Sequence, residues 1–243
     1  MSSASRPGVS DFGISGGDGA VHRGDDPRFD LAAAVRRVVA AIVAGDIDDE
    51  HLRAATAAVA SVADALEAAA GPHRRPRVQP DPAGAAQDFF PTSPVIGFAN
   101  PLAPPVRVEV VDGELQGTAW FDYQYEGPPT CVHGGVIALV MDELLGSANI
   151  VAGNPAMTGT LTIRYRRPTP LRTELRLRAR CLGRSGRKVR AWGGMYLGDE
   201  LTAEAEGIFV ELGPERFVAM IAEAGLASAG DASAGPAGGA AAG

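Results

Sequence analysis

Hydrophobic and polar residues alternate along six segments in the second half of the chain. These segments are 106–111, 115–121, 157–165, 174–182, 188–197 and 201–212. A period of two places apolar side chains on one face of a strand and polar side chains on the other. We therefore expect an antiparallel sheet with one buried face and one solvated face. Asp112-Gly113, between the first two segments, predicts a tight hairpin turn.

A different period interrupts these strands between residues 135 and 149. Apolar residues there cover much of the circumference of a helix, which is typical of a buried helix. The order is thus two strands, one buried helix and four strands. The simplest arrangement is an α+β fold in which one long antiparallel sheet wraps around one buried helix.

Two more helices are predicted near the N-terminus, over 29–44 and 49–70, because Val, Leu and Ile recur there at helical spacing. They form a helical hairpin that we expect to pack on the main domain or on a partner subunit. The predicted organisation has five parts: a disordered N-terminus (1–27), the helical hairpin (28–71), a Pro-rich linker (72–87), the α+β domain (88–222) and a disordered Ala/Gly tail (223–243).

Composition narrows the classes of function. A net charge of −7 argues against general nucleic-acid binding. Only two cysteines occur, without close-spaced partners, so neither a disulfide framework nor a cysteine zinc site is expected. No apolar run approaches the roughly 20 residues of a membrane span, and the first residues lack the apolar core of a signal peptide. We expect a cytoplasmic protein without a bound metal or cofactor.

The charge is unevenly distributed. Eleven of the 22 Lys and Arg residues lie between 164 and 190, where Glu174 is the one acid. Such a block is typical of a phosphate-binding surface, or equally of the solvated face of strands. The sequence leaves both interpretations open.

The turn His133-Gly134-Gly135 precedes the buried helix and carries the first candidate chemistry. A helix N-terminus has unpaired N–H donors and the positive end of the helix dipole, so it can stabilise an oxyanion. The alternative is an ordinary Gly-rich helix start. A metal role for His133 is disfavoured because no second histidine lies at ligand spacing. We expect its side chain to make a hydrogen bond that shapes the loop.

Asp142 is the second candidate, because an acid inside an apolar helix is costly to bury without a partner or a function. The alternative is a solvated carboxylate.

Two other motifs are weaker candidates for a catalytic site. The stretch 13–17 matches the nucleophile-elbow pattern of serine hydrolases but lacks the flanking strand and helix. Cys131 lacks a base, so a packed thiol is the simpler interpretation.

Together these residues resemble a known family. Gly127-Pro128-Pro129 before the turn, the acid nine residues after His133, Met157-Thr158 and the final Tyr-Arg-Arg-Pro resemble hotdog thioesterases of the PaaI-like superfamily. Within it, the chain looks closest to the THEM4-like acyl-CoA thioesterases. The resemblance covers about 89–212.

The resemblance implies a hotdog fold and hydrolysis of acyl-CoA. Asp142 would be the nucleophile or general base, and the N–H of Gly134 would polarise the thioester carbonyl. Thr158 would orient the water or the carboxylate. Other implied contacts are Gly135 with the substrate and Arg164, Arg166 and Arg187 with the CoA phosphates. The chain departs from many relatives at Gly127, where they carry a polar side chain.

Helix geometry adds a constraint. Gly134 and Asp142 are eight residues apart on one helix, about 12 Å in axial rise. One chain therefore cannot bring both to the same carbonyl carbon, which requires approach to about 3–3.5 Å. We expect a homodimer or homotetramer, paired through antiparallel helices and the strand 157–165. The alternatives are an acyl-thioester hydratase or dehydratase, and a non-catalytic acyl-CoA binding module.

Overall fold

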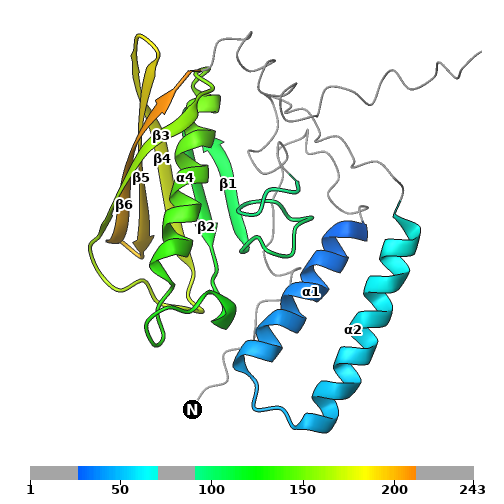
Figure 1. Ribbon diagram of the computed structural model, residues 1–243. Coiled ribbons are helices and arrows are strands. Elements are labelled where there is room, and N and C mark those ends of the chain that lie inside the picture. Colours follow the sequence, from blue (N-terminus) through cyan, green and yellow to red (C-terminus); the bar gives the residue numbers. More distant parts are fainter. Residues whose placement is uncertain (1–26, 71–90, 212–243) are drawn as a thin grey trace, which may run out of the picture.

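The computed structural model describes residues 27–70 and 91–211. The predicted N-terminal tail, the linker, the C-terminal tail and the serine-hydrolase-like stretch 13–17 lie outside these residues. The described residues form an α+β unit and, beside it, a pair of helices (Figure 1).

A six-stranded antiparallel sheet curves around one helix, as predicted. The order across the sheet is β1-β2-β4-β5-β6-β3, so β3 lies at one edge. The elements are β1 (Val106–Val111), β2 (Glu114–Ala119), α4 (Gly134–Val151), β3 (Met157–Tyr165), β4 (Leu175–Ser185), β5 (Lys188–Leu197) and β6 (Glu200–Val210). The predicted turn between β1 and β2 is also present, since Asp112 and Gly113 both have positive φ, at 52° and 78°.

The core lies between the inner face of the sheet and α4. Leu145, on the helix, approaches β5 and β6 where each strand has a glycine. A Cβ atom at Gly193 would lie 2.7 Å from Leu145 Cδ1, and one at Gly207 would lie 3.1 Å from Leu145 Cδ2. These two glycines therefore allow the sheet to pack closely against the helix.

One side of α4 remains uncovered, so the prediction of a helix buried all round holds only in part. Leu139 is 44% exposed, and next to it β3 exposes Met157 (49%) and Tyr165 (55%). Among the described residues, α4 is the one helix long and apolar enough to cross a membrane, and most of its other large apolar side chains lie in the core.

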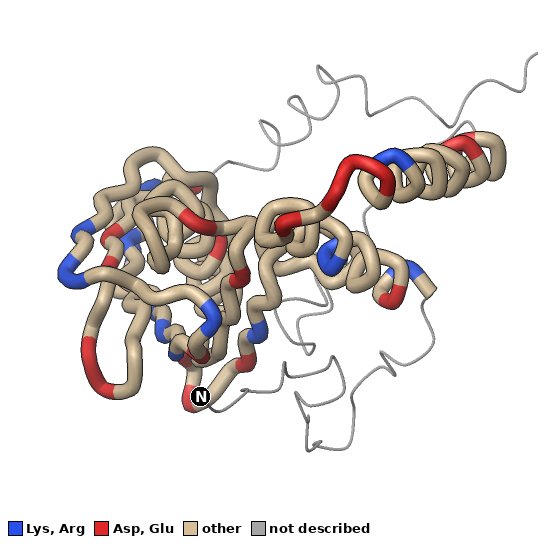
Figure 2. The backbone as a smooth tube through the Cα atoms, turned by 90° about the horizontal axis from the view of Figure 1, so that it is seen from below, with Lys and Arg blue, Asp and Glu red and all other residues tan. Residues whose placement is uncertain are grey.

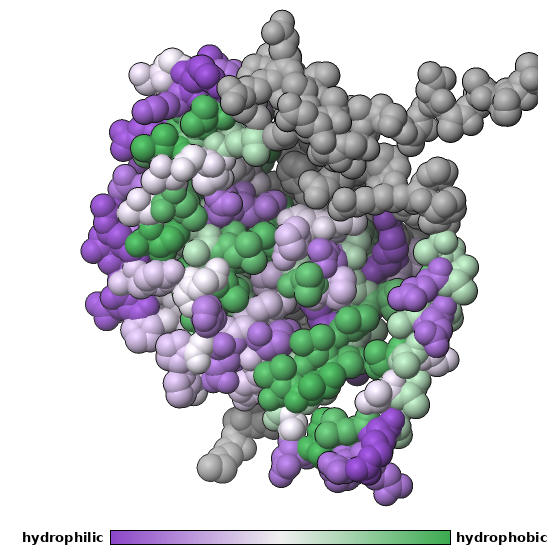
Figure 3. Space-filling model, in the orientation of Figure 1, coloured by the Kyte–Doolittle hydropathy of each residue, from purple (hydrophilic) through white to green (hydrophobic). Residues whose placement is uncertain are grey.

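The helical hairpin consists of α1 (Pro27–Ala44) and α2 (Asp49–Ala69), close to the predicted bounds. α1 packs on the α+β unit through its alanine face, with Ala32 and Ala40 buried. The larger apolar side chains of both helices remain exposed, and they form the green surface over the hairpin in Figure 3. None of the residues of α2 is buried.

Candidate active site

The N-terminus of α4 presents one unpaired donor. His133 is the N-cap, and its Nδ1 accepts the Gly135 N–H at 3.0 Å, the loop-shaping hydrogen bond that the sequence predicts. Within the described residues no group accepts the N–H of Gly134. Because Nδ1 accepts this hydrogen bond, a neutral His133 carries its proton on Nε2. The ring thus caps the helix through Gly135 and leaves the N–H of Gly134 available to an anion.

Tyr165, the first residue of the Tyr-Arg-Arg-Pro motif and not among the predicted site residues, also lies at this end of the helix. Its hydroxyl donates to the Gly134 carbonyl at 2.8 Å. A Cβ atom on Gly134 would lie 3.3 Å from the same hydroxyl, so a side chain at that position would crowd it. The feature of the sequence that could have pointed to Tyr165 is its position as the last residue of an alternating strand, directly before Arg166.

Asp142 lies two turns further along, on the partly exposed side of α4. Thr158 Oγ1, from the start of β3, donates to Asp142 Oδ1 at 2.8 Å. The structure therefore brings together the carboxylate and the hydroxyl that the family resemblance pairs. The bond fixes one carboxylate oxygen and leaves the other without a protein partner among the described residues.

A cavity of about 400 Å³ opens beside this pair. Asp142 and Thr158 lie in its wall, with the C-terminal half of α4 on one side and Phe209 of β6 on another. The turn segment 91–94 closes it further. A volume of this size is in the range of small-molecule sites, roughly 300–1,000 Å³.

The structure does not bring Gly134 and Asp142 together, because both lie on one straight helix. Their separation remains about 12 Å along the axis. The exposed side of α4 and the outer edge of β3 are adjacent, and no described strand pairs with that edge. Both are thus accessible to a second chain, as the predicted shared site requires.

The loop before the turn has no room for a polar side chain. A Cβ atom on Gly127 would lie 2.7 Å from His133 Cα. A helper side chain, as many relatives carry here, would need the backbone to move.

Cys131 is a half-buried free thiol. No cluster of three potential metal ligands occurs in the part of the chain that the structure describes.

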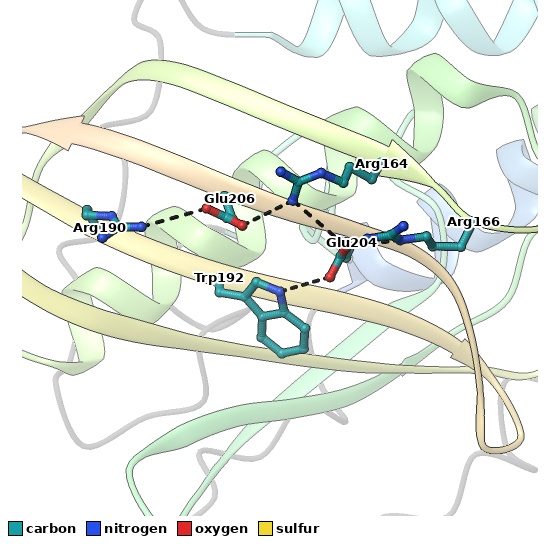
Figure 4. A network of polar contacts seen from close by, with 6 residues as sticks. All are labelled: Arg164, Arg166, Arg190, Trp192, Glu204 and Glu206. Atoms are coloured by element: carbon teal, nitrogen blue, oxygen red, sulfur yellow. Dashed lines mark hydrogen bonds and ion pairs between the residues drawn. The ribbon is translucent and has the colours of Figure 1, made fainter.

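The basic block lies on the outer face of the sheet, where most of its arginines are paired with acids. Arg166 bonds to Glu204, and Arg164 lies 3.1 Å from Glu206 and 3.9 Å from Glu204 (Figure 4). The bonded Arg166 guanidinium lowers the pKa of the Glu204 carboxyl, despite some desolvation. Figure 2 shows the same mixture of basic and acidic positions over the whole unit.

This pairing favours the solvated-face interpretation for Arg164 and Arg166, and their contact with CoA stays a prediction. Arg187 differs because its guanidinium donates to a backbone carbonyl, that of Glu211, at 3.1 Å. Among the described residues no carboxylate pairs with Arg187. Its charge is therefore not offset by a paired carboxylate among the described residues, and its contact with a CoA phosphate stays a prediction.

Comparisons with known proteins identify the fold and the family. The model of the thioesterase superfamily matches residues 130–191, from the glycine turn into β5. The crystal structure of a thioesterase superfamily protein aligns with a TM-score of 0.71 and 34% sequence identity, over 77% of this chain and 92% of that one. The chain belongs to the thioesterase superfamily. Its six-stranded sheet around one helix is the hotdog fold that the sequence predicts.

Within the superfamily, the chain is similar to acyl-coenzyme A thioesterase THEM4. The identity is 34% over 93 residues with the protein of Bos taurus and 36% over 93 residues with that of Mus musculus. These matches cover 37% of this chain and 38–40% of the relatives. The chain thus matches about two fifths of the length of these curated relatives. The aligned crystal structure extends the similarity beyond the hotdog unit, which makes up only about half of the chain.

Proposed function

We propose that this protein hydrolyses acyl-CoA thioesters to a free acid and CoA. The observation that carries the proposal is the Asp142 carboxylate, held by Thr158 at the wall of a cavity large enough for an acyl group. The named activity of the similar relatives, acyl-coenzyme A thioesterase, supports the choice of thioester.

Asp142 performs the chemistry in one of two ways. As a general base it takes a proton from water, whose oxygen attacks the carbonyl carbon. As a nucleophile it attacks that carbon itself, and water then cleaves the resulting anhydride. In both routes the C–S bond breaks, the acyl carbon gains a hydroxyl, and the sulfur leaves as CoA thiol after taking up a proton. Thr158 holds Oδ1, so Oδ2 is the oxygen directed at the water or the thioester.

The Gly134 N–H of a second subunit stabilises the oxyanion in this proposal. It is the donor at the positive end of the α4 dipole that lacks an acceptor among the described residues. Its distance from Asp142 on the same helix requires a partner chain, which reaches the site along the exposed side of α4 and the edge of β3. The active species is accordingly a homodimer or a larger assembly built from it.

CoA binds through charge in this proposal. Its phosphates match the bidentate geometry of arginine, and Arg187 is the best placed of the predicted contacts because no described carboxylate neutralises it. To bind a phosphate, Arg164 would have to give up its ion pair with Glu206, and Arg166 its bond with Glu204.

The test is a screen of the full chain on acetyl-, hexanoyl-, palmitoyl- and phenylacetyl-CoA with a free-thiol reagent. We expect enzyme-dependent release of CoA thiol from at least one of them. Tight binding of an acyl-CoA without thiol release would overturn the proposal and leave the binding module. A hydratase would instead consume enoyl-CoA without releasing thiol; the capping role of His133 speaks against it.

A further inference from the structure

Resting on the proposed function, we infer that the cavity beside Asp142 holds the acyl group, that Gly146 sets its width, and that α1 fixes its wall at 91–94. The N-terminal hairpin thereby gains a role in substrate choice. The inference stands on the order of residues along α4, on the space above Gly146, and on a chain of hydrogen bonds from α1.

The cavity follows α4 away from the reacting carboxylate. Asp142, Gly146 and Ile150 are spaced by four residues, so they lie on one side of the helix, about 6 Å apart per step. Met157 and Phe209 form the opposite wall. An acyl group whose carbonyl lies at Asp142 therefore extends past Gly146 toward Ile150, with the apolar side chains of Met157 and Phe209 beside it.

Gly146 has the smallest side chain of the residues that such an acyl group would pass. Glycine inside a helix is about 1 kcal/mol less favourable than alanine, so the position carries a cost in stability. Packing within the protomer does not require it: a Cβ atom there would meet only Phe209 Cε1, at 3.8 Å, an ordinary contact. A side chain at this position would instead occupy the cavity. Glycine thus keeps the passage open.

A third wall of the cavity is the compact turn segment 91–94, which is anchored from two sides. Val95 and Ile96 are buried in the core. The Asn100 amide donates to the carbonyl of Thr92, a residue of the cavity wall, at 3.1 Å. The segment is therefore closed on itself, and Asn100 is one of the residues that hold it in place.

Asn100 is held by α1. Arg36 donates to the Asn100 carbonyl at 2.9 Å, and Phe29 packs edge-on against Phe98 with ring centroids 6.5 Å apart. The connection runs from α1 through Asn100 and Thr92 to the cavity. α2 makes no comparable contact among the described residues, since all its side chains are exposed.

The first test compares Gly146→Ala and Gly146→Leu with wild type, as kcat/KM over the acyl-CoA series. The leucine variant should lower the ratio of the hexanoyl and palmitoyl values to the acetyl value by about tenfold or more, the usual penalty for a side chain that competes with substrate for space. Alanine should give a smaller shift in the same direction, and it fits the helix if leucine impairs folding. An unchanged ratio in both variants overturns the assignment of Gly146.

The second test is Arg36→Ala, with Arg53→Ala as the matched control. Arg53 is an exposed arginine of α2 whose partner is Asp49 in the same helix. We expect Arg36→Ala to raise KM for hexanoyl- and palmitoyl-CoA severalfold relative to acetyl-CoA, and Arg36→Lys to restore part of the difference. Arg53→Ala should leave the profile unchanged. If the KM values of Arg36→Ala across the acyl-CoA series match those of Arg53→Ala, α1 does not support the cavity wall.

Failure of this inference differs from failure of the proposed function. If the wild-type chain releases no CoA thiol from any acyl-CoA, the function itself is wrong. If it does so, and the variants at Gly146 and Arg36 keep the wild-type chain-length profile, the function stands and the acyl group lies elsewhere.

Discussion

At the scale of single residues, the candidate site depends on the hydrogen bonds made at two places on α4, its N-terminus and its middle. His133 accepts the N–H of Gly135, which leaves the N–H of Gly134 available. Thr158 donates to one oxygen of Asp142, which leaves the other available. In both cases a hydrogen bond to a neighbouring group leaves one particular atom without a partner among the described residues, and in the proposed function that atom faces the substrate.

Thr158 is a positioning residue in this account, and Thr158→Val tests it. Loss of a hydrogen bond to a charged group, worth about 1.5–3 kcal/mol, should lower kcat by roughly 10- to 100-fold with a smaller change in KM. Thr158→Ser should recover most of the rate because it keeps the hydroxyl. If valine and serine give the same kcat, the hydroxyl does not orient Asp142.

Tyr125 gives a pH-dependent prediction. Burial raises the pKa of its hydroxyl to about 12, although Arg36 opposes the rise. The unfolded value is about 10, so the folded state is stabilised below that pH by roughly 2–3 kcal/mol at most. That contribution is lost as the pH rises from about 10 to the folded pKa near 12.

The comparison is the free energy of unfolding of wild type and Tyr125→Phe by denaturant titration at several alkaline pH values. At pH 8 the phenylalanine variant should be about 1 kcal/mol less stable, because it loses the hydrogen bond to the Leu102 carbonyl. Above pH 10 wild type should lose stability faster, and the difference should shrink or reverse. Parallel curves would contradict the desolvation of the hydroxyl at this partly buried position.

The sequence could point to some site residues and not to others. His133, Gly134 and Asp142 were accessible because their chemistry is local: a glycine turn before a helix and an acid within it. Thr158 followed from the family resemblance. Tyr165 entered only as part of the Tyr-Arg-Arg-Pro motif and Gly146 not at all, because the hydrogen bond of the one and the cavity position of the other depend on contacts between elements, which spacing along the chain does not contain.

At the scale of elements, alternation was sufficient to locate the strands. β1, β3 and β5 have the predicted bounds, because strand periodicity and turn residues are local signals. The pairing of β2 with β4 across the intervening helix has no such signal. For α1, the helical period located the helix but did not say which face would pack, and the buried residues are Ala32 and Ala40.

Arg187 provides the prediction for the outer face of the strands. Arg187→Ala should raise KM more than it lowers kcat, since it removes binding that ground and transition states share. The effect should decrease at high salt and be much smaller for an acyl-pantetheine, which lacks the nucleotide phosphates. Arg176→Ala is the control, because Asp199 and the Gly198 carbonyl already hold that arginine. An equal loss on both substrates would make Arg187 structural.

At the scale of the whole molecule, the uncovered side of α4 and the free edge of β3 define where a second chain is expected. If two chains share each site, variants with different defects should complement each other. Asp142→Asn removes the carboxylate and Gly134→Pro removes the N–H. After subunit exchange, each mixed dimer should contain one intact site and one doubly damaged site, so the mixture should recover part of the activity. An active monomer at assay concentration would rule out the shared site.

The most direct measurement is the rate of CoA thiol release by Asp142→Asn on the best substrate. The amide is nearly isosteric with the carboxylate and can still accept the bond from Thr158, but it cannot serve as nucleophile or base. We predict a loss of kcat of about 100-fold or more, with unchanged thermal stability and unchanged affinity for CoA. A kcat close to that of wild type would contradict the assignment of Asp142 as the catalytic carboxylate.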